Sequence, residues 1–258
     1  MSHKKILITG ASSGIGKELA LILAKDKYEL ILVGRNHARL QQVLEAVRKT
    51  SVAESIQADL SSREGVLLVC SEISRLLPDV VINNAGMGFY GEVISHSQQE
   101  ALEIISTNCS SVVAISQAYA KCMIEKGRQG TILNVSSCLS FVPCPLAAVY
   151  AASKGFINQF SKALDFELEP HGIRVLVACP GQVATEFRAR ASKGKTGITK
   201  NDMVLNSHDV AKAIWRQIVE QKPLQIINWR YRLFVMLTKI LPESVVKKWL
   251  EKTLRGRI

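Results

Sequence analysis

The sequence predicts an α/β fold, in which helices flank both faces of a doubly wound parallel sheet, and three observations indicate it. Short β-rich runs alternate with longer helical patterns along the 258 residues. The runs are almost continuously apolar, as in Asp79-Val80-Val81-Ile82 and Val175-Leu176-Val177-Ala178, which is typical of strands buried on both faces. The connections are short, which favours right-handed βαβ units.

The expected elements alternate in chain order. The expected strands are 4–9, 29–33, 54–58, 79–83, 131–136, 173–179 and 224–228. The expected helices are 15–26, 36–49, 63–77, 98–125, 149–168 and 208–220, with a further helical stretch at 243–255. Because ligands of such sheets bind beyond the carboxyl ends of the strands, the functional motifs should cluster there.

The length fits a single large α/β domain, with 1–228 as its main body and 229–258 as a basic, apolar helical extension. A hydrophobic content of 47% is enough for a substantial core. The six cysteines include no C-x-x-C pair, which favours a reducing compartment over a zinc site or a disulfide framework. We expect a cytoplasmic protein, because no segment reaches the roughly 18 apolar residues of a membrane span and the first apolar run is too short for a secretion signal.

Three glycines link the first expected strand to the first expected helix. Gly10, Gly14 and Gly16 form the pattern G-x-x-x-G-x-G. They permit a tight turn, a close approach of the backbone to a pyrophosphate and close packing of the helix, whose free N–H groups favour phosphate. An ordinary glycine-rich turn is the alternative, but this placement favours a dinucleotide site. Its expected residues are Gly10, Ser12, Ser13, Gly14, Ile15 and Gly16.

The end of the second expected strand bears on the choice of cofactor. NAD sites usually place a carboxylate there to bind the ribose hydroxyls. Here the chain reads Leu32-Val33-Gly34-Arg35-Asn36, without an acid. Arg35 can pair with the 2′-phosphate of NADP, or it is an ordinary surface arginine. Because the acid is also missing, we favour NADP(H) over NAD(H).

Tyr150 and Lys154 stand four residues apart at the start of an expected helix, and therefore on one face of it. A nearby ammonium lowers the pKa of a phenol, so Tyr150 can exchange a proton with a substrate oxygen while a hydride moves at the carbon. Such a pair alone is common on helix surfaces. Ser137, just past a central strand, can hydrogen-bond the same oxygen, although a serine there can also cap a helix or turn.

Together with these residues, Asn83-Asn84-Ala85-Gly86 after the fourth strand and Asn108 in the next helix resemble the classical short-chain dehydrogenase/reductase family. The resemblance covers nearly all of residues 4–228, with the motifs in the family's order. It implies a Rossmann-type sheet of seven strands in the order 3-2-1-4-5-6-7. It also implies a catalytic tetrad, which is Asn108, Ser137, Tyr150 and Lys154.

The resemblance further implies roles for these residues. Tyr150 is the general acid in reduction, Lys154 also holds the nicotinamide ribose, and Asn108 positions a water in a proton relay. The other cofactor-binding residues that it implies are Asp59 and Leu60 beside the adenine, Asn84, Ala85 and Gly86 in the cleft, and Pro180, Gly181, Val183 and Thr185 around the nicotinamide. Family members usually pair through the long helices, so a homodimer or homotetramer is expected.

Two positions depart from the family pattern. Ser140 stands where the family often has Gly or Ala, and its small size predicts little effect. Ser13 stands where many NADP-preferring members carry a basic residue, which leaves the cofactor prediction resting mainly on Arg35.

Two segments are expected to face the substrate. Residues 138–149 are mostly apolar, which suits a hydrophobic ketone or acyl chain, and equally suits packing under a loop. Residues 182–206 are basic and contain Gly194 and Gly197, a pattern that predicts a mobile lid. Lys193 and Lys195 in this segment meet either an acidic substrate group or water.

The net charge of +11 is concentrated near the C-terminus, where residues 222–258 hold nine basic and two acidic residues, a net of +7. In the extension 229–258, aromatic and aliphatic residues stand beside Lys and Arg, which is typical of a helix in a membrane interface. The same pattern fits a helix that covers the substrate mouth, or a subunit contact. No nucleic-acid recognition motif accompanies the charge, so no nucleic-acid partner is expected.

The leading prediction is an NADP(H)-dependent oxidoreductase that reduces the carbonyl of a small, hydrophobic ketone or aldehyde, or of a long-chain 3-oxoacyl substrate, to an alcohol. The alternatives are an NADP⁺-dependent alcohol dehydrogenase, a non-catalytic dinucleotide-binding sensor and a nucleic-acid-binding protein. A pure sensor has no need of Tyr150 and Lys154 together, and net charge alone supports the last.

Overall fold

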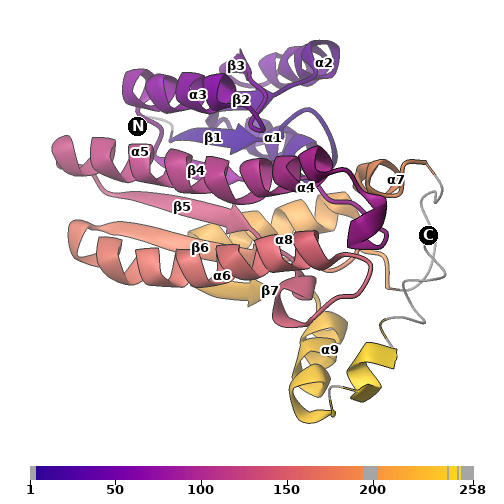
Figure 1. Ribbon diagram of the computed structural model, residues 1–258. Coiled ribbons are helices and arrows are strands. Elements are labelled where there is room, and N and C mark those ends of the chain that lie inside the picture. Colours follow the sequence, from indigo (N-terminus) through magenta and orange to yellow (C-terminus); the bar gives the residue numbers. More distant parts are fainter. Residues whose placement is uncertain (1–3, 195–202, 243, 249, 251–258) are drawn as a thin grey trace.

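A sheet whose neighbouring strands all run parallel forms the centre of the structure, a computed structural model that describes residues 4–194, 203–242, 244–248 and 250 (Figure 1). The seven strands lie in the order β3-β2-β1-β4-β5-β6-β7. They are β1 (Lys5–Thr9), β2 (Glu29–Gly34), β3 (Ala53–Gln57), β4 (Val80–Asn83), β5 (Gly130–Val135), β6 (Ile173–Cys179) and β7 (Leu224–Ile226). Order and direction confirm the predicted doubly wound fold.

Helices cover both faces of this sheet (Figure 1). They are α1 (Gly14–Lys25), α2 (His37–Arg48), α3 (Arg63–Leu76), α4 (Gln98–Ile105), α5 (Ser111–Glu125), α6 (Ala148–Leu168), α7 (Phe187–Ala191), α8 (Ser207–Val219) and α9 (Trp229–Ile240). Residues 244–248 form a further short helical segment. None of the helices in the described ranges is long and apolar enough to cross a membrane.

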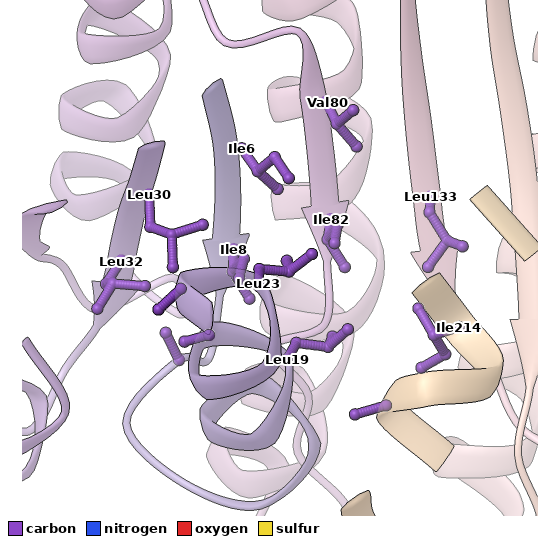
Figure 2. Close-up of a cluster of buried hydrophobic side chains, with 14 of the residues drawn as sticks. Ile6, Ile8, Leu19, Leu23, Leu30, Leu32, Val80, Ile82, Leu133 and Ile214 are labelled. Carbon is purple, nitrogen blue, oxygen red and sulfur yellow. The ribbon is translucent and has the colours of Figure 1, made fainter. Parts of the chain in front are cut away.

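The core has two layers because successive side chains of a buried strand point to opposite faces. Ile6 and Ile8 of β1 pack with α1, α2 and α8, whereas Leu7 packs with α3 and α5 on the other face. Figure 2 shows the first layer, in which Leu19 and Leu23 of α1 meet side chains of β1, β2 and β4. Strands buried on both faces explain the continuous apolar runs of the sequence.

The structure differs from the predicted elements in three places. The predicted helix 98–125 is interrupted by a π-helical turn at Ser106–Ser110, which inserts an extra residue between α4 and α5. The last strand ends at Ile226, because Asn228 adopts a φ of 78° and caps α9 with its side chain. Helix α7 lies within the segment that was predicted only as a lid.

Some residues of the predicted lid and of the predicted last helix lie outside the described ranges. These residues are Lys195 and Gly197 of the predicted lid, and position 243 with most of 249–255 in the predicted last helix.

Candidate active site

The residues predicted from separate motifs line one cavity of about 700 Å³ at the carboxyl ends of β1, β2, β4, β5 and β6. This is where a doubly wound sheet binds ligands. Among the predicted site residues only Gly16 and Asn108 are absent from the cavity wall. Those that line it are Gly10, Ser12, Ser13, Gly14, Ile15, Arg35, Asp59, Leu60, Asn84, Ala85, Gly86, Ser137, Tyr150, Lys154, Pro180, Gly181, Val183 and Thr185.

The glycine turn brings backbone unusually close to backbone at one side of the cavity. Gly10 and Gly14 have φ values of 66° and 55°, in the left-handed region that glycine adopts without strain. A Cβ on Gly16 would lie 2.3 Å from the carbonyl oxygen of Gly10, so only glycine fits there. Helix α1 can therefore begin immediately beside the end of β1.

The start of α1 has free hydrogen-bonding capacity that faces this cavity. The side chain of Ser13, the N-cap of α1, accepts no hydrogen bond from the first backbone N–H groups of the helix, whereas the N-caps of α2 and α3 on the same half of the sheet do. The first N–H groups of a helix carry a partial positive charge and bind phosphate well. The turn thus fits the pyrophosphate of a dinucleotide.

Thr9, a residue that the sequence did not single out, fastens the turn to the neighbouring strand. The Thr9 hydroxyl accepts hydrogen bonds from the backbone N–H groups of Asn84 and Ala85, both at 3.0 Å. In return, the Asn84 side chain donates to the carbonyls of Thr9 at 2.9 Å and Gly10 at 3.3 Å. The ends of β1 and β4 therefore form one rigid wall.

Three arginines gather where the adenosine half of a dinucleotide would lie. Arg35 has a guanidinium nitrogen 4.0 Å from a carboxylate oxygen of Asp59. Burial favours a higher pKa for Asp59, but hydrogen bonds from the backbone and side chain of Ser61, helped by the charge of Arg35, hold that pKa below its usual value. Arg190 lies near enough to Arg35 and to Arg39 to interact electrostatically with both.

Helix α7 carries Arg190 into this group. Glu186, directly before α7, forms an ion pair with Arg39 at the start of α2, at 2.5 Å, and lies 3.9 Å from Arg190. Burial lowers the pKa of Arg190, and the positive charges of Arg35 and Arg39 lower it further, whereas Glu186 opposes this. At its other end α7 leads to Lys193, which pairs with Glu100 of α4 at 2.6 Å. The helix is thus held across the cavity from both sides.

Tyr150, Lys154 and Ser137 meet at the centre of the cavity. The ammonium of Lys154 donates to the carbonyl of Val135 at 2.9 Å and lies 5.9 Å from the centre of the Tyr150 ring. The Ser137 hydroxyl hydrogen-bonds the hydroxyl of Tyr150. It also accepts from the backbone N–H of Leu139 at 3.2 Å, so the serine caps a short helical turn while facing the tyrosine.

Burial moves the pKa values of this pair apart. It raises the pKa of Tyr150, and the nearby Tyr90 adds to this, while the hydrogen bond from Ser137 works in the opposite direction. Burial lowers the pKa of Lys154 to about 8. The expectation from the sequence that the pKa of Tyr150 lies below its ordinary value is therefore not met in this geometry, because burial outweighs the stabilising effect of an ammonium that lies 5.9 Å from the ring centre. At neutral pH the pair consists of a phenol and an ammonium ion.

Asn108 acts through the backbone beside the cavity. In the π turn its side chain points at Met87, accepting from the Met87 N–H and donating to the Met87 carbonyl, both at 2.8 Å. It also donates to the Ser153 hydroxyl at 2.9 Å. A Cβ on Gly86 would lie 3.4 Å from the Lys154 ammonium and 3.5 Å from the Asn108 oxygen, so both side chains border Gly86.

Mostly apolar side chains form the remaining wall, together with Gln182 and the buried Arg188. They include Leu139 and Phe187, and also Tyr231 and Phe234 of α9 together with Leu250. The Tyr231 ring packs onto Gly181, while its hydroxyl accepts from the backbone of Gln182 at 2.9 Å and donates to the carbonyl of Met203 at 2.7 Å. The inner face of the extension therefore covers the cavity, as one of the three alternatives for 229–258 predicted.

Comparisons with known proteins agree with this geometry. The family described as "short chain dehydrogenase" has a sequence profile that matches residues 4–196. Dehydrogenase/reductase SDR family member 7B of Danio rerio is 32% identical over 239 residues, which cover 86% of this chain and 76% of that protein. The very-long-chain 3-oxoacyl-CoA reductase of Phaeosphaeria nodorum is 36% identical over 190 residues, which cover 66% of this chain and 52% of that protein.

Length and structure add to these comparisons. Probable oxidoreductase EphD of Mycobacterium tuberculosis is 26% identical over 93% of this chain, but the chain spans only 43% of the length of that protein. A short-chain dehydrogenase from Sphingobium yanoikuyae, solved in complex with NADPH, superimposes with a TM-score of 0.83. It is 27% identical, and the match covers 90% of this chain and 91% of that one.

Replacing Asn108 by alanine should loosen the segment around Met87. The substitution removes the partners of a part-buried backbone N–H and carbonyl, which costs about 1–3 kcal/mol. Amide hydrogen exchange of Met87 should therefore become about five- to hundredfold faster. The control Asn36→Ala removes an exposed cap of α2 and should leave this exchange unchanged. Equal exchange rates in the wild type and in Asn108→Ala would show that the two hydrogen bonds from Asn108 do not stabilise the backbone at Met87.

Proposed function

This chain belongs to the short-chain dehydrogenase family, and we propose that it uses NADPH to reduce the carbonyl of a hydrophobic ketone, aldehyde or 3-oxoacyl substrate to an alcohol. The observation that carries the proposal is the meeting of a buried phenol, Tyr150, and a buried ammonium, Lys154, inside a cavity that begins at a phosphate-binding turn. Neither feature alone requires redox chemistry, but together they provide a proton donor next to a dinucleotide site.

The residues of the cavity fit a nicotinamide dinucleotide along its whole length. The glycine turn and the start of α1 would hold the pyrophosphate, and Asp59 with Leu60 would border the adenine. Pro180, Gly181, Val183 and Thr185 would frame the nicotinamide, which supplies the hydride when the cofactor is bound. A Cβ on Gly14 would lie 3.0 Å from the side chain of Thr185, which supports the need for glycine on this path.

The arginine group supports a preference for NADP(H). Arg35 is only half-buried by its neighbours, and its nearest acid, Asp59, lies at the limit of an ion pair. Arg39 and Arg190 add positive charge to the same region, and their mutual repulsion would be relieved by a phosphate dianion. The structural relative solved with NADPH gives further support.

The burial of Tyr150 supports its role as the proton donor of a reduction at neutral pH. A phenol with a raised pKa remains protonated, so it can donate its proton to the oxygen of the carbonyl as hydride reaches the carbon. The Ser137 hydroxyl hydrogen-bonds the Tyr150 hydroxyl and lies beside the oxygen that receives the proton. The charge of Lys154 stabilises the phenolate that remains on Tyr150 after the proton has left. Oxidation of an alcohol would instead begin from the phenolate, which burial disfavours.

The role of Asn108 follows from its contacts. Its amide fixes the backbone at Met87, next to Gly86, and so supports the cavity wall beside Lys154. The carbonyl oxygen of its side chain retains one lone pair beyond the bond from Met87. That lone pair can accept from a water, in line with the proton relay that the family resemblance implies.

The apolar wall supports a hydrophobic substrate. Leu139, Phe187, Phe234 and Leu250 offer no charge to a sugar or a small acid. A relative named very-long-chain 3-oxoacyl-CoA reductase supports the acyl variant of the proposal. Self-association is also proposed, since Leu102 and Ile105 of α4 and Phe166 of α6 expose apolar surface on the long helices.

NADPH oxidation should be fastest with long-chain 3-oxoacyl thioesters and bulky apolar ketones, and slow with sugar ketones. In Tyr150→Phe the turnover should fall by about 10² to 10⁴, the usual contribution of a general acid. NADPH binding, followed by its fluorescence, should remain because the aromatic ring is kept. Tyr90→Phe removes another hydroxyl from the cavity wall and should retain most of the turnover.

Two results would refute this proposal. Full turnover in Tyr150→Phe would remove the proposed proton donor. An absence of NADPH binding in the wild-type chain would leave the cavity without its cofactor.

Arg35→Ala should raise the KM for NADPH about ten- to hundredfold, because a hydrogen bond to a charged group contributes about 1.5–3 kcal/mol. Arg190→Ala should raise the same KM by a smaller factor, since it reaches the site from the far side. The KM for NADH should stay constant in both variants. Arg63→Ala, at the exposed start of α3, serves as the control. A parallel rise for NADPH and NADH would mean that these arginines do not read the 2′-phosphate.

Raising the pH through about 8 should lower kcat/KM for NADPH at saturating ketone. This parameter follows the free enzyme, where Lys154 loses its proton near that value while Tyr150 keeps its own. The neutral amine no longer stabilises the phenolate that proton donation produces. Lys154→Arg, whose side chain stays charged, should show no such decline. A flat wild-type profile up to the pKa of an exposed lysine would contradict the assignment.

A further inference from the structure

Helix α9 has an inner face that covers the cavity and an outer face that is apolar but exposed. The exposed side chains are Trp229, Leu233, Met236, Leu237 and Ile240. Their spacings of three and four residues place them in one stripe along the helix. Ile240 is 74% exposed and Trp229 is 65% exposed, so the described protein surface leaves the stripe largely uncovered.

Basic side chains flank this stripe on both sides. At 100° per residue, Arg230 lies on one side of it, and Arg232 and Lys239 lie on the other. The adjoining segment 244–248 adds exposed Lys247 and Lys248 beside the exposed Val245. From Trp229 to the end of the sequence there are eight basic residues and two acidic ones, Glu243 and Glu251. The positive charge that the sequence concentrates at this end therefore surrounds an apolar surface.

The inner face of the same segments belongs to the cavity. Tyr231 and Phe234 of α9 line it, and Leu250 lines it from the chain that follows. Leu250 also packs with Val142 and Ala151 near the start of α6. Figure 1 shows α9 and the short helical segment after it lying together at the edge of the molecule, beyond β7. One thin layer of chain thus separates the cavity from the apolar stripe.

We propose that α9 and residues 244–248 dock on the surface of an anionic phospholipid bilayer, with the stripe immersed at the level of the headgroups and the helix parallel to the surface. An apolar stripe between basic rows is the arrangement that such an interface stabilises, since lipid tails take the apolar side chains and anionic headgroups take the charges. The docked face then brings the cavity mouth next to the bilayer.

Charge complementarity favours lipid over a second copy of this chain. In a two-fold contact centred on the stripe, each patch would meet an identical patch. The rows that contain Arg232 and Lys239 would then face equally basic rows at close range, which is unfavourable. Residues 251–258 of this chain are a poor partner for the stripe as well. They contain three basic residues and one acidic residue, so they are net positive and would be repelled by the basic rows.

Vesicle binding of the full chain with NADPH present tests the proposal. The protein should co-sediment with vesicles of phosphatidylcholine and phosphatidylglycerol at low salt. It should bind much more weakly to vesicles of phosphatidylcholine alone, and to either at high salt. Tryptophan fluorescence should shift to shorter wavelength on binding and be quenched by brominated lipid, and Trp229→Phe should reduce this response, to which Trp215 and Trp249 also contribute.

Surface variants separate the two parts of the docking face. Met236→Gln combined with Ile240→Gln should abolish most of the binding, because both side chains leave water only in the docked state. Lys239→Glu combined with Lys248→Glu should weaken binding to anionic vesicles by about 25-fold or more, since each basic residue near such a surface contributes about fivefold. Leu67→Gln combined with Val219→Gln makes matched changes at exposed sites on α3 and α8 and should leave binding intact.

The oligomeric state of the same variants, measured by light scattering without vesicles, tests the alternative that the stripe contacts a second copy of this chain. The proposal is overturned if Met236→Gln/Ile240→Gln dissociates an assembly while wild-type protein ignores anionic vesicles. It is also overturned if wild-type binding is equal for the two vesicle compositions. An unchanged assembly with lost vesicle binding supports it. Because these measurements require no catalysis, the docking proposal and the proposed reductase function can fail independently.

Discussion

The closeness of α1 to the end of β1 is the contact on which the cavity depends. Gly16 lets the helix lie against the carbonyl of Gly10, where a Cβ would come within 2.3 Å. The same carbonyl accepts a hydrogen bond from the side chain of Asn84, whose backbone N–H is in turn held by Thr9. A single close approach therefore sets the direction of the α1 N–H groups and the position of the wall at the end of β4.

Packing also decides the electrostatics at the centre of the cavity. Tyr150 and Lys154 sit on a face of α6 that is turned to the cavity, where Lys154 reaches the carbonyl of Val135 at the end of β5. Burial disfavours both charged forms, so it raises the pKa of Tyr150 and lowers that of Lys154 to about 8. The pair thus keeps its phenol and its ammonium together over the neutral range, the state that a proton donor needs.

Motifs contained in one short segment could be predicted from the sequence, whereas contacts between distant segments could not. The glycine turn and the Tyr150–Lys154 pair each lie within one turn and one helix, and parallel strands bring their ends to one edge. Arg190 meets Arg39 only because α7 crosses the cavity after β6, and no spacing along the chain signals this. The Asn108 side chain in the π turn is likewise held by the part-buried backbone groups of Met87, which only tertiary packing brings to it.

The rotation of α9 about its axis is fixed from inside the protein. Tyr231 must face inward, because its ring packs on Gly181 and its hydroxyl is bonded to Gln182 and Met203. With that side fixed, the residues at Trp229, Met236 and Ile240 must face outward. A helix whose outer face meets only water carries polar residues there, as α2 does with Gln42, Glu45 and Arg48. The outer residues of α9 are apolar instead. The cavity does not require them, so their apolar character indicates a second contact on the outside of the helix.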